Sequence, residues 1–460
     1  MMVKTGPTDS EQTRSLGVWA TYFMIVGNVV GVGIFTTNGY ISNYIHSPIL
    51  ILSLWVLGGI LAICGALTYA ELSSRFPVAG GDFVFLSRAI HPFLGFVFGW
   101  SALMVTYTGS IAVIAVGMGN YALHFFPEGL KAISVAVPGG FIELGFDKIL
   151  AILAILAFTY LNTFKLKLGV LWQGFLTVFG VSVLLMFIGV GLTSPYCQWQ
   201  NLNGGDWNVA GGISGFGNAL AAVFFTYSGW TAAVYVAGEV KNPQRNIPRA
   251  LLGGLMTVMS LYLATQLVFI LAAPVAEMKD QIDLGLVALN RLRGPAWVPF
   301  FNLIITFAIL STLNATILSG ARIYYAMGRR GDFIAAFGKL HPENGTPVFA
   351  LWAQAIWSIL LIASGSFNQL LSYTVFMMVC FAFLAGVAQI ILRIKAKGEA
   401  GFRMPIFPFP VILFMFMTGW IMLETLLHQP QQAMAALILV LLGWPVYLIL
   451  NSRQKKSPEA

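Results

Sequence analysis

Charged side chains are scarce in this chain. Asp, Glu, Lys and Arg make up 9% of its 460 residues, whereas 58% are hydrophobic. A soluble domain carries about 25% charged residues, so the composition excludes an ordinary soluble protein. Several apolar runs exceed the roughly 20 residues that cross a bilayer. The sequence therefore predicts an all-α integral membrane protein surrounded by lipid.

Cysteine and histidine are also rare. Two of the three cysteines, Cys64 and Cys380, fall in apolar runs and Cys197 stands alone in a loop, so no disulfide framework is indicated. The five histidines are scattered and share no metal-ligand spacing. The chain also lacks the Gly-rich loop with a lysine that holds ATP phosphates. We therefore expect neither an enzyme, nor a metal site, nor an ATP-driven pump.

The basic residues predict how the chain crosses the membrane. With the N-terminus inside, 20 Lys and Arg fall on inner segments and 5 on outer segments, as the positive-inside rule requires. Residues 1–16 and 451–460 are then cytoplasmic tails of a multi-pass protein of the cell membrane (an inner or plasma membrane). The net charge of +8 follows this topology and indicates no nucleic-acid partner. The twelve expected spans are 17–40, 48–72, 93–123, 148–163, 169–193, 213–238, 248–273, 296–325, 348–364, 368–392, 408–427 and 432–450.

The first apolar run contains a weak point. Gly27, Gly31 and Gly33 lie within seven residues, and each glycine costs a helix about 1 kcal/mol relative to alanine. We expect the helix to stop near Val30 and to restart after Gly33. The restarting end would offer free N–H groups to a carboxylate, and the freed carbonyls of Val29 and Val30 would accept from an ammonium group.

The same glycines have a second interpretation. Gly27 and Gly31 are four residues apart, which is the small-xxx-small spacing that lets membrane helices pack closely. Taken alone, the first run does not decide between a binding site and a packing face.

A second weak point lies in the sixth span, at Tyr227, Ser228 and Gly229. Carbonyls released around Phe225, Thr226 and Ser228 would complete an ammonium cage opposite the first break. A neighbouring aromatic ring would add cation–π attraction or close over the solute, or it would simply pack. Interrupted helices in corresponding halves of a chain are a good sequence indication of a transporter's solute site.

The two breaks lie five spans apart, so the helices that carry them run in opposite directions. This arrangement fits a 5+5 inverted repeat. Residues 17–193 would form the first repeat, residues 213–392 the second, and residues 408–450 two further spans. All of them belong to one transmembrane domain.

Polar segments at the inner ends of the spans supply candidate gate residues. Glu71 and Arg75 are one helical turn apart and can pair, whereas Arg322 can pair with Glu71 or Glu239 or can anchor its helix at the interface. We interpret residues 80–82 as the structural turn of a re-entrant loop that lines the cytoplasmic gate.

Five stretches together resemble the amino acid–polyamine–organocation (APC) superfamily, and within it the L-type amino acid transporter branch. They occur in order across spans 1 to 10. The resemblance implies the leucine-transporter fold, with a central amino-acid site between spans 1 and 6. The stretches are Gly31-Val-Gly-Ile-Phe35, Tyr69-Ala-Glu-Leu72 with Gly80-Gly-Asp82, Phe225–Trp230, Asn242-Pro-Gln-Arg-Asn-Ile-Pro248 and Ala321-Arg-Ile-Tyr-Tyr325.

The resemblance also implies roles for individual residues. The family's carboxylate-binding amides would fall on Val32 and Gly33. Its amine-binding carbonyls would fall on Val29, Phe225 and Ser228, and its gating aromatic on Phe225. Two asparagines match polar positions near the solute. The predicted substrate site as a whole comprises Asn28, Val29, Val30, Gly31, Val32, Gly33, Phe225, Thr226, Tyr227, Ser228 and Asn314.

The chain departs from the family pattern at several positions. Val32 stands where a small polar residue is usual, and Gly180 stands where some members carry a lysine that replaces a sodium ion. Proton coupling of that type is therefore in doubt, whereas Ser311 and Thr312 could supply oxygens to sodium. Apart from such a coupling ion, no cofactor is expected. Loop 124–147 lacks the cysteine that links animal relatives to a glycoprotein, so we expect no such partner, and a monomer or homodimer.

The expected walls of the site favour a neutral substrate. No acidic residue lies in the middle of spans 1, 3, 6, 8 or 10, and a buried cationic side chain would lack a counter-charge. We expect a largely apolar lining from Val32, Met104, Tyr107, Phe225 and Asn314. The sequence thus predicts a secondary transporter of neutral amino acids, working by alternating access as an exchanger or symporter. The alternatives are a permease for another small amine (a cationic amino acid, polyamine or amino-acid derivative) and a transporter-like amino-acid sensor.

Overall fold

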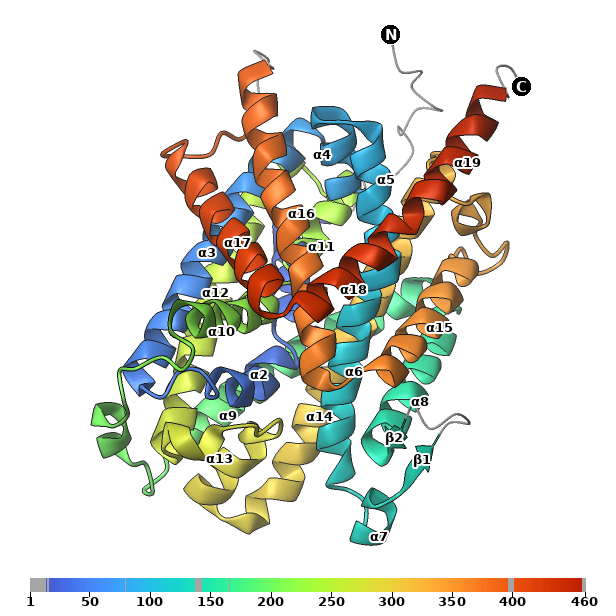
Figure 1. Ribbon diagram of the computed structural model, residues 1–460. Coiled ribbons are helices and arrows are strands. Elements are labelled where there is room, and N and C mark those ends of the chain that lie inside the picture. The colour runs from blue at the N-terminus through green and yellow to red at the C-terminus, as the bar shows by residue number, and fades with distance from the viewer. Residues whose placement is uncertain are drawn as a thin grey trace.

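The computed structural model of this chain describes residues 14, 16–78, 80–136, 143–164, 166–395 and 401–456. Residues 1–13 and 15 of the predicted N-terminal tail and residues 457–460 of the predicted C-terminal tail lie outside the described residues. Residues 451–456 of the expected C-terminal tail continue the last helix. The described chain is predominantly helical (Figure 1).

The helices follow the apolar runs closely. Two short strands, β1 (Ser134–Ala136) and β2 (Glu143–Gly145), pair antiparallel with Ser134 opposite Gly145. A π-helical turn, η1 (Ala102–Thr106), joins two helices into one long span. Among the described residues the α-helices are α1 (Val18–Val29), α2 (Gly33–Ile41), α3 (Pro48–Arg75), α4 (Asp82–Ala89), α5 (Pro92–Ser101), α6 (Tyr107–Leu123), α7 (Glu128–Lys131), α8 (Phe146–Asn162), α9 (Leu166–Leu192), α10 (Gly212–Tyr227), α11 (Ala232–Tyr235), α12 (Pro243–Ala272), α13 (Leu284–Arg293), α14 (Val298–Arg329), α15 (Val348–Ser364), α16 (Phe367–Lys395), α17 (Phe409–His428), α18 (Pro430–Leu441) and α19 (Gly443–Lys456).

Within the described ranges, nine helical segments are long and apolar enough to cross a membrane. This finding confirms a multi-pass helical membrane protein. The other three expected spans contain α8, α10 and α15, which have 17, 16 and 17 residues. These helices are shorter than the roughly 20 residues of a full crossing, so the count of twelve stays a prediction.

The helices divide the molecule into two opposite faces. In Figure 1, α4 lies at the same face as the C-terminal end of α19, which we call the terminal face. The strands, α7 and α13 lie at the other face. Of the nine apolar segments, the one formed by α5, η1 and α6 is the most buried, and α6 packs against α8, α14, α15 and α16.

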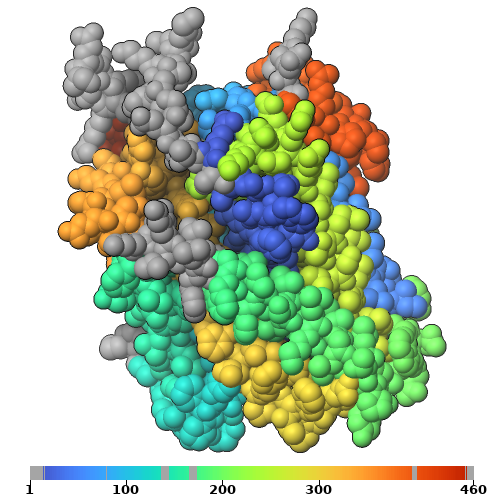
Figure 2. Space-filling model, turned by 180° about the vertical axis from the view of Figure 1, so that it is seen from behind, coloured from blue at the N-terminus to red at the C-terminus, as the bar shows by residue number. Residues whose placement is uncertain are grey.

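The helix with the first break lies partly at the surface. Figure 2 shows α1 in blue, beside α12 in yellow-green and above α9 in green, and α1 packs against both helices. Its outer side carries Trp19 and Phe23, which are 69% and 47% exposed. Large exposed apolar side chains suit a lipid-facing surface, so α1 has one side toward lipid and the other toward the core.

A buried carboxylate ties three segments together at the terminal face. Glu71 at the end of α3 is fully buried and accepts hydrogen bonds from Arg75 at 3.1 Å and from Arg393 of α16 at 3.0 Å. The backbone N–H of Met404 donates to the same carboxylate at 2.9 Å. The guanidinium of Arg393 also lies 4.0 Å from the ring centroid of Phe407. Glu71 therefore holds the ends of α3 and α16 and the segment before α17 in register.

We expect Glu71→Gln to destabilise the fold, because a hydrogen bond to a charged group contributes about 1.5–3 kcal/mol. Thermal unfolding in detergent measures the loss. The matched control is Glu128→Gln, which removes an exposed ion pair with Lys131 and should change stability by less than about 0.5 kcal/mol. Equal unfolding temperatures for the two variants would contradict the role given to Glu71.

Candidate functional site

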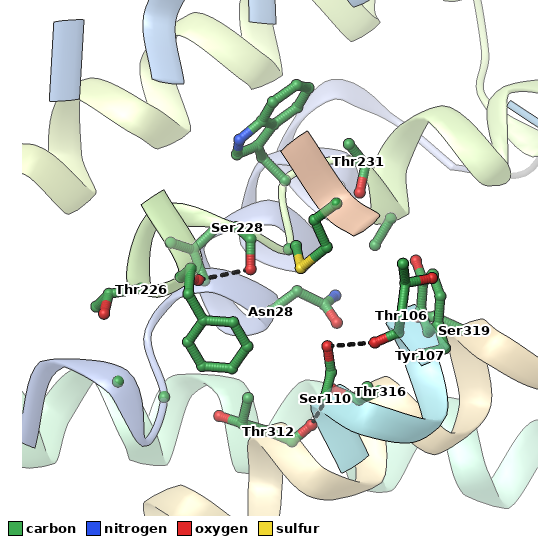
Figure 3. Close-up of a pocket in the computed structure, with 18 of the residues that line it drawn as sticks. Asn28, Thr106, Tyr107, Ser110, Thr226, Ser228, Thr231, Thr312, Thr316 and Ser319 are labelled. Carbon is green, nitrogen blue, oxygen red and sulfur yellow. Dashed lines mark hydrogen bonds between the residues drawn. The ribbon is translucent and has the colours of Figure 1, made fainter. Parts of the chain in front are cut away.

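The two predicted breaks exist and border one internal cavity (Figure 3). The first separates α1 from α2 at residues 30–32, and the second separates α10 from α11 at residues 228–231. Side chains or backbone from α3, α4, α5, η1, α6, α14 and α16 complete the lining. Of the substrate and ion residues predicted from the sequence, those that line the cavity are Asn28, Val29, Gly31, Val32, Gly33, Phe225, Thr226, Ser228 and Thr312.

Other predicted site residues lie outside this lining. Tyr227 turns away from the cavity, and its hydroxyl donates to the carbonyl of Trp55 at 3.2 Å. The side-chain oxygen of Asn314 accepts from Asn162 at 2.7 Å, which joins α14 to α8. Val30 and Ser311 are buried but are not part of the lining either. These positions therefore lie beside the cavity without forming part of its lining.

The first break leaves a helix end without partners. The amides of Val32, Gly33 and Ile34 make no hydrogen bond within the described residues, and Val32 and Gly33 line the cavity. Such amides open the nine-residue helix α2. Free N–H groups at the positive end of a helix attract a carboxylate, as predicted from the sequence.

The glycines of the first break also permit close packing. A Cβ added to Gly27 would lie 2.3 Å from Thr177, and one added to Gly31 would lie 2.4 Å from the hydroxyl of Thr312. A Cβ on Gly33 would lie 2.7 Å from the hydroxyl of Thr226. The packing interpretation of this glycine run is therefore confirmed, and the same residues lie at the break between α1 and α2.

The second break touches the first. Ser228 has extended backbone and Gly229 has a φ of +103°, a conformation that favours glycine. A Cβ on Gly229 would lie 2.5 Å from the carbonyl oxygen of Asn28. The second unwound segment thus meets the backbone of α1 at its end, next to the first break, and Gly229 is the residue that allows this approach.

Most carbonyls released by the breaks already accept hydrogen bonds. Tyr262 of α12 donates to the carbonyls of Val29 at 2.6 Å and Thr226 at 3.2 Å. Thr312 donates to the carbonyl of Val30 at 3.2 Å. The carbonyl of Phe225 accepts from the hydroxyl of Ser228 at 2.6 Å. The predicted ammonium cage is therefore largely capped by the protein, although each carbonyl keeps a second lone pair.

The lining is largely apolar, as expected, but it carries more hydroxyl groups than the sequence suggested, and of the expected residues Met104 and Asn314 are not part of it. Several of these hydroxyls, such as those of Ser110 and Thr316, donate to carbonyls of their own helices. Such a bond satisfies the hydroxyl hydrogen within an apolar helix, so the sequence gives no sign of a binding role. The hydroxyl oxygen can still accept a hydrogen bond from a ligand. The hydroxyl residues of the lining, labelled in Figure 3, are Thr106, Ser110, Thr226, Ser228, Thr231, Thr312, Thr316 and Ser319, with the phenol of Tyr107 beside them.

One acidic residue reaches the cavity. Asp82 begins α4, is 2% exposed, and lines the cavity. Tyr235 of α11 donates to its Oδ2 at 2.9 Å. This position was not predicted from the sequence, because Asp82 lies between two expected spans and only the fold brings the start of α4 to the cavity. The cavity therefore does contain a carboxylate, contrary to expectation.

Of the predicted gate residues, Phe225 lines the cavity, whereas Glu71 and Arg322 lie outside the lining. The pairing of Glu71 with Arg75 is confirmed at 3.1 Å. Arg322 approaches Glu239 at 3.8 Å. Its alternative pairing with Glu71 is wrong, because Arg75 and Arg393 occupy that carboxylate. Arg322 therefore links α14 to the segment after α11.

Known proteins resemble this chain along nearly its whole length. The model of a family described as Amino acid permease matches residues 16–444. The Serine/threonine exchanger SteT of Bacillus subtilis (strain 168) is 26% identical, with 97% of this chain and 99% of that protein covered. The b(0,+)-type amino acid transporter 1 of Mus musculus is 27% identical, with 95% and 88% covered. The Large neutral amino acids transporter small subunit 2 of Homo sapiens is 25% identical, with 95% and 80% covered.

We expect Tyr262→Phe to destabilise the protein, because it removes the donor shared by Val29 and Thr226. An unpaired buried carbonyl costs about 1–3 kcal/mol, so the thermal unfolding temperature in detergent should fall. Tyr22→Phe is the control, since it removes only one hydrogen bond, to Thr257, at a partly buried position. An equal fall in both variants would show that Tyr262 is not the main cap of the breaks.

Proposed function

The chain belongs to the amino acid permease family, and on that premise we propose that it exchanges small neutral amino acids across the cell membrane. Membership agrees with the APC resemblance and makes the chain an amino acid transporter, not an enzyme. The neutral substrate, the exchange and the mechanism are the proposed part. The observation that carries them is the pair of touching helix breaks within one hydroxyl-lined cavity.

The cavity suits a zwitterion with a small polar side chain. The free amides of Val32 and Gly33 would bind its carboxylate. The carbonyl of Ser228, which makes no hydrogen bond within the described residues, would accept from its ammonium together with the side-chain oxygen of Asn28. Hydroxyls such as Ser110 and Thr316 would hydrogen-bond a polar side chain. The similar SteT protein is named a serine/threonine exchanger, which supports both this choice and exchange.

Alternating access is the proposed mechanism, within a fold of twelve spans, a 5+5 inverted repeat and cytoplasmic termini. Tyr262 of α12 is bonded to both breaks, which favours movement of α1, α10 and α12 as one unit. A single hydrogen bond joins Thr312 of α14 to the carbonyl of Val30, and it would break when this unit moves away from α14. Phe225 lines the cavity beside the second break and would close over the solute, while Arg322 and Glu239 would hold the terminal side.

Ion coupling and assembly also remain proposals. Sodium would use oxygens of Ser311 and Thr312, because Thr312 already lies against the first break. Residue 180 is a glycine and has no side chain that could replace a sodium ion. The space beside it is open, because an added Cβ would meet only Ala308, at 3.9 Å. We propose a monomer or homodimer that needs no covalent glycoprotein partner.

A second candidate substrate class follows from Asp82. A carboxylate in the lining could pair with a cationic side chain, so basic amino acids belong among the tested solutes. Counterflow in proteoliposomes tests transport: labelled serine should accumulate transiently in vesicles preloaded with unlabelled serine. A sensor would bind serine and raise the unfolding temperature without counterflow. Faster counterflow of lysine than of serine would favour the second candidate.

We expect Gly33→Leu to abolish exchange while the protein remains folded in detergent. A side chain at residue 33 would push against Thr226 and fill the space in front of the free amides. Uptake of labelled serine and thermal unfolding are measured together. The control is Gly189→Leu on the exposed side of α9, where an added Cβ meets nothing within 4 Å. Normal exchange by Gly33→Leu would refute the proposed carboxylate site.

A further inference from the structure

Asp82 is a buried carboxylate without a counter-ion in its cavity. Its Oδ2 accepts from Tyr235, whereas its Oδ1 is buried and accepts no hydrogen bond within the described residues. The described lining of the cavity contains no Lys, Arg or His. An ionised carboxylate in such a place is expensive. A bound proton removes this cost, because it neutralises the carboxylate and occupies almost no space.

The groups around Asp82 provide no positive charge. Three phenols face it from separate helices, Tyr69 of α3, Tyr107 of α6 and Tyr235 of α11. Helix α5 has no charged residue, and Arg393 of α16 pairs with Glu71.

Two further cations lie near α4 but are held elsewhere. The guanidinium of Arg88, on α4 itself, lies over the ring of Phe76, and that of Arg330, just after α14, lies over the ring of Phe83. Burial raises the pKa of the Asp82 carboxyl from 3.8 to about 6, although the neighbouring phenols of Tyr69 and Tyr235 lower it. The Asp82 carboxyl therefore gains and loses its proton near physiological pH.

A chain of hydroxyls connects Asp82 to the second helix break. Thr231 lies in that break and lines the cavity. The phenols of Tyr107 and Tyr235 both interact with Thr231, and their ring centroids are 6.0 Å apart. Since Tyr235 in turn donates to Asp82, any shift of α11 during transport must change the surroundings of the carboxylate.

We propose that Asp82 is a proton-binding site through which amino acid exchange is linked to protons at the terminal face. This inference rests on the proposed function. A proton from the aqueous phase adds to Oδ1 and gives the neutral acid, while Tyr235 continues to donate to Oδ2. When α11 moves away from α4, water reaches the carboxyl and the proton returns to solution. The closed arrangement is thus stabilised at acidic pH, and this stabilisation is lost as the pH rises through about 6.

The test is the pH profile of serine exchange in proteoliposomes with equal pH on both sides. For a group with a pKa of about 6, the protonated fraction falls about tenfold between pH 5 and pH 7, and the rate should change over the same interval. Asp82→Asn keeps the shape of the neutral acid and should give a flat profile. The control is Asp332→Asn, because burial also raises the pKa of Asp332 but it lies outside the lining. It should retain the wild-type profile.

The outcomes separate this inference from the proposed function. Absence of serine exchange by the unmodified protein at every pH defeats the proposed function. Exchange by Asp82→Asn with the wild-type profile overturns the proton site alone. So does selective loss of lysine exchange at all pH values with an unchanged serine profile, since Asp82 would then pair with the substrate. If Asp82→Asn is inactive, a pH dye reports proton uptake or release when serine binds the unmodified protein at pH 6. No proton change there refutes the inference.

Discussion

The structure depends on one constraint, that backbone groups freed inside a membrane protein must find partners away from bulk water. Two helices are interrupted where they touch, so both release carbonyls and amides into the same region. Tyr262, Thr312 and Ser228 take up most of the carbonyls. The amides of Val32 and Gly33 are left over, and they are the groups that a carboxylate would satisfy. The protein thus caps the negative ends of its broken helices and leaves a positive end uncapped beside the cavity.

This division explains why glycine and threonine recur at the breaks. Gly31 lies against Thr312, Gly33 against Thr226, and Gly229 against the carbonyl of Asn28. Each glycine removes a side chain where two backbones or a backbone and a hydroxyl must approach. Close approach places the hydroxyls within reach of freed carbonyls. The same contacts give a cavity with hydroxyl groups on largely apolar walls and Asp82 as the charged residue of its described lining, which suits a solute that carries both charges on its own backbone.

Much of this arrangement was predictable from the sequence, and the remainder depended on tertiary folding. Three glycines within residues 27–33 located the first break, and Gly229 beside Ser228 located the second. The four-residue spacing of Glu71 and Arg75 predicted their ion pair. The caps on the breaks were not predictable, because Tyr262 is one tyrosine in an apolar helix and only packing brings it to Val29 and Thr226. Asp82 was misjudged for a related reason. Its loop position suggested a structural turn, whereas the fold carries it to the cavity wall.

The most direct measurement compares the binding of three solutes to the purified protein by calorimetry: L-serine, its methyl ester and ethanolamine. The three share an ammonium and a hydroxyl, but only serine has a free carboxylate. If the amides that open α2 recognise the carboxylate, serine should bind at least about tenfold more tightly than either analogue, which corresponds to about 1.4 kcal/mol. Equal affinities would contradict the claim that the broken helix forms the binding site.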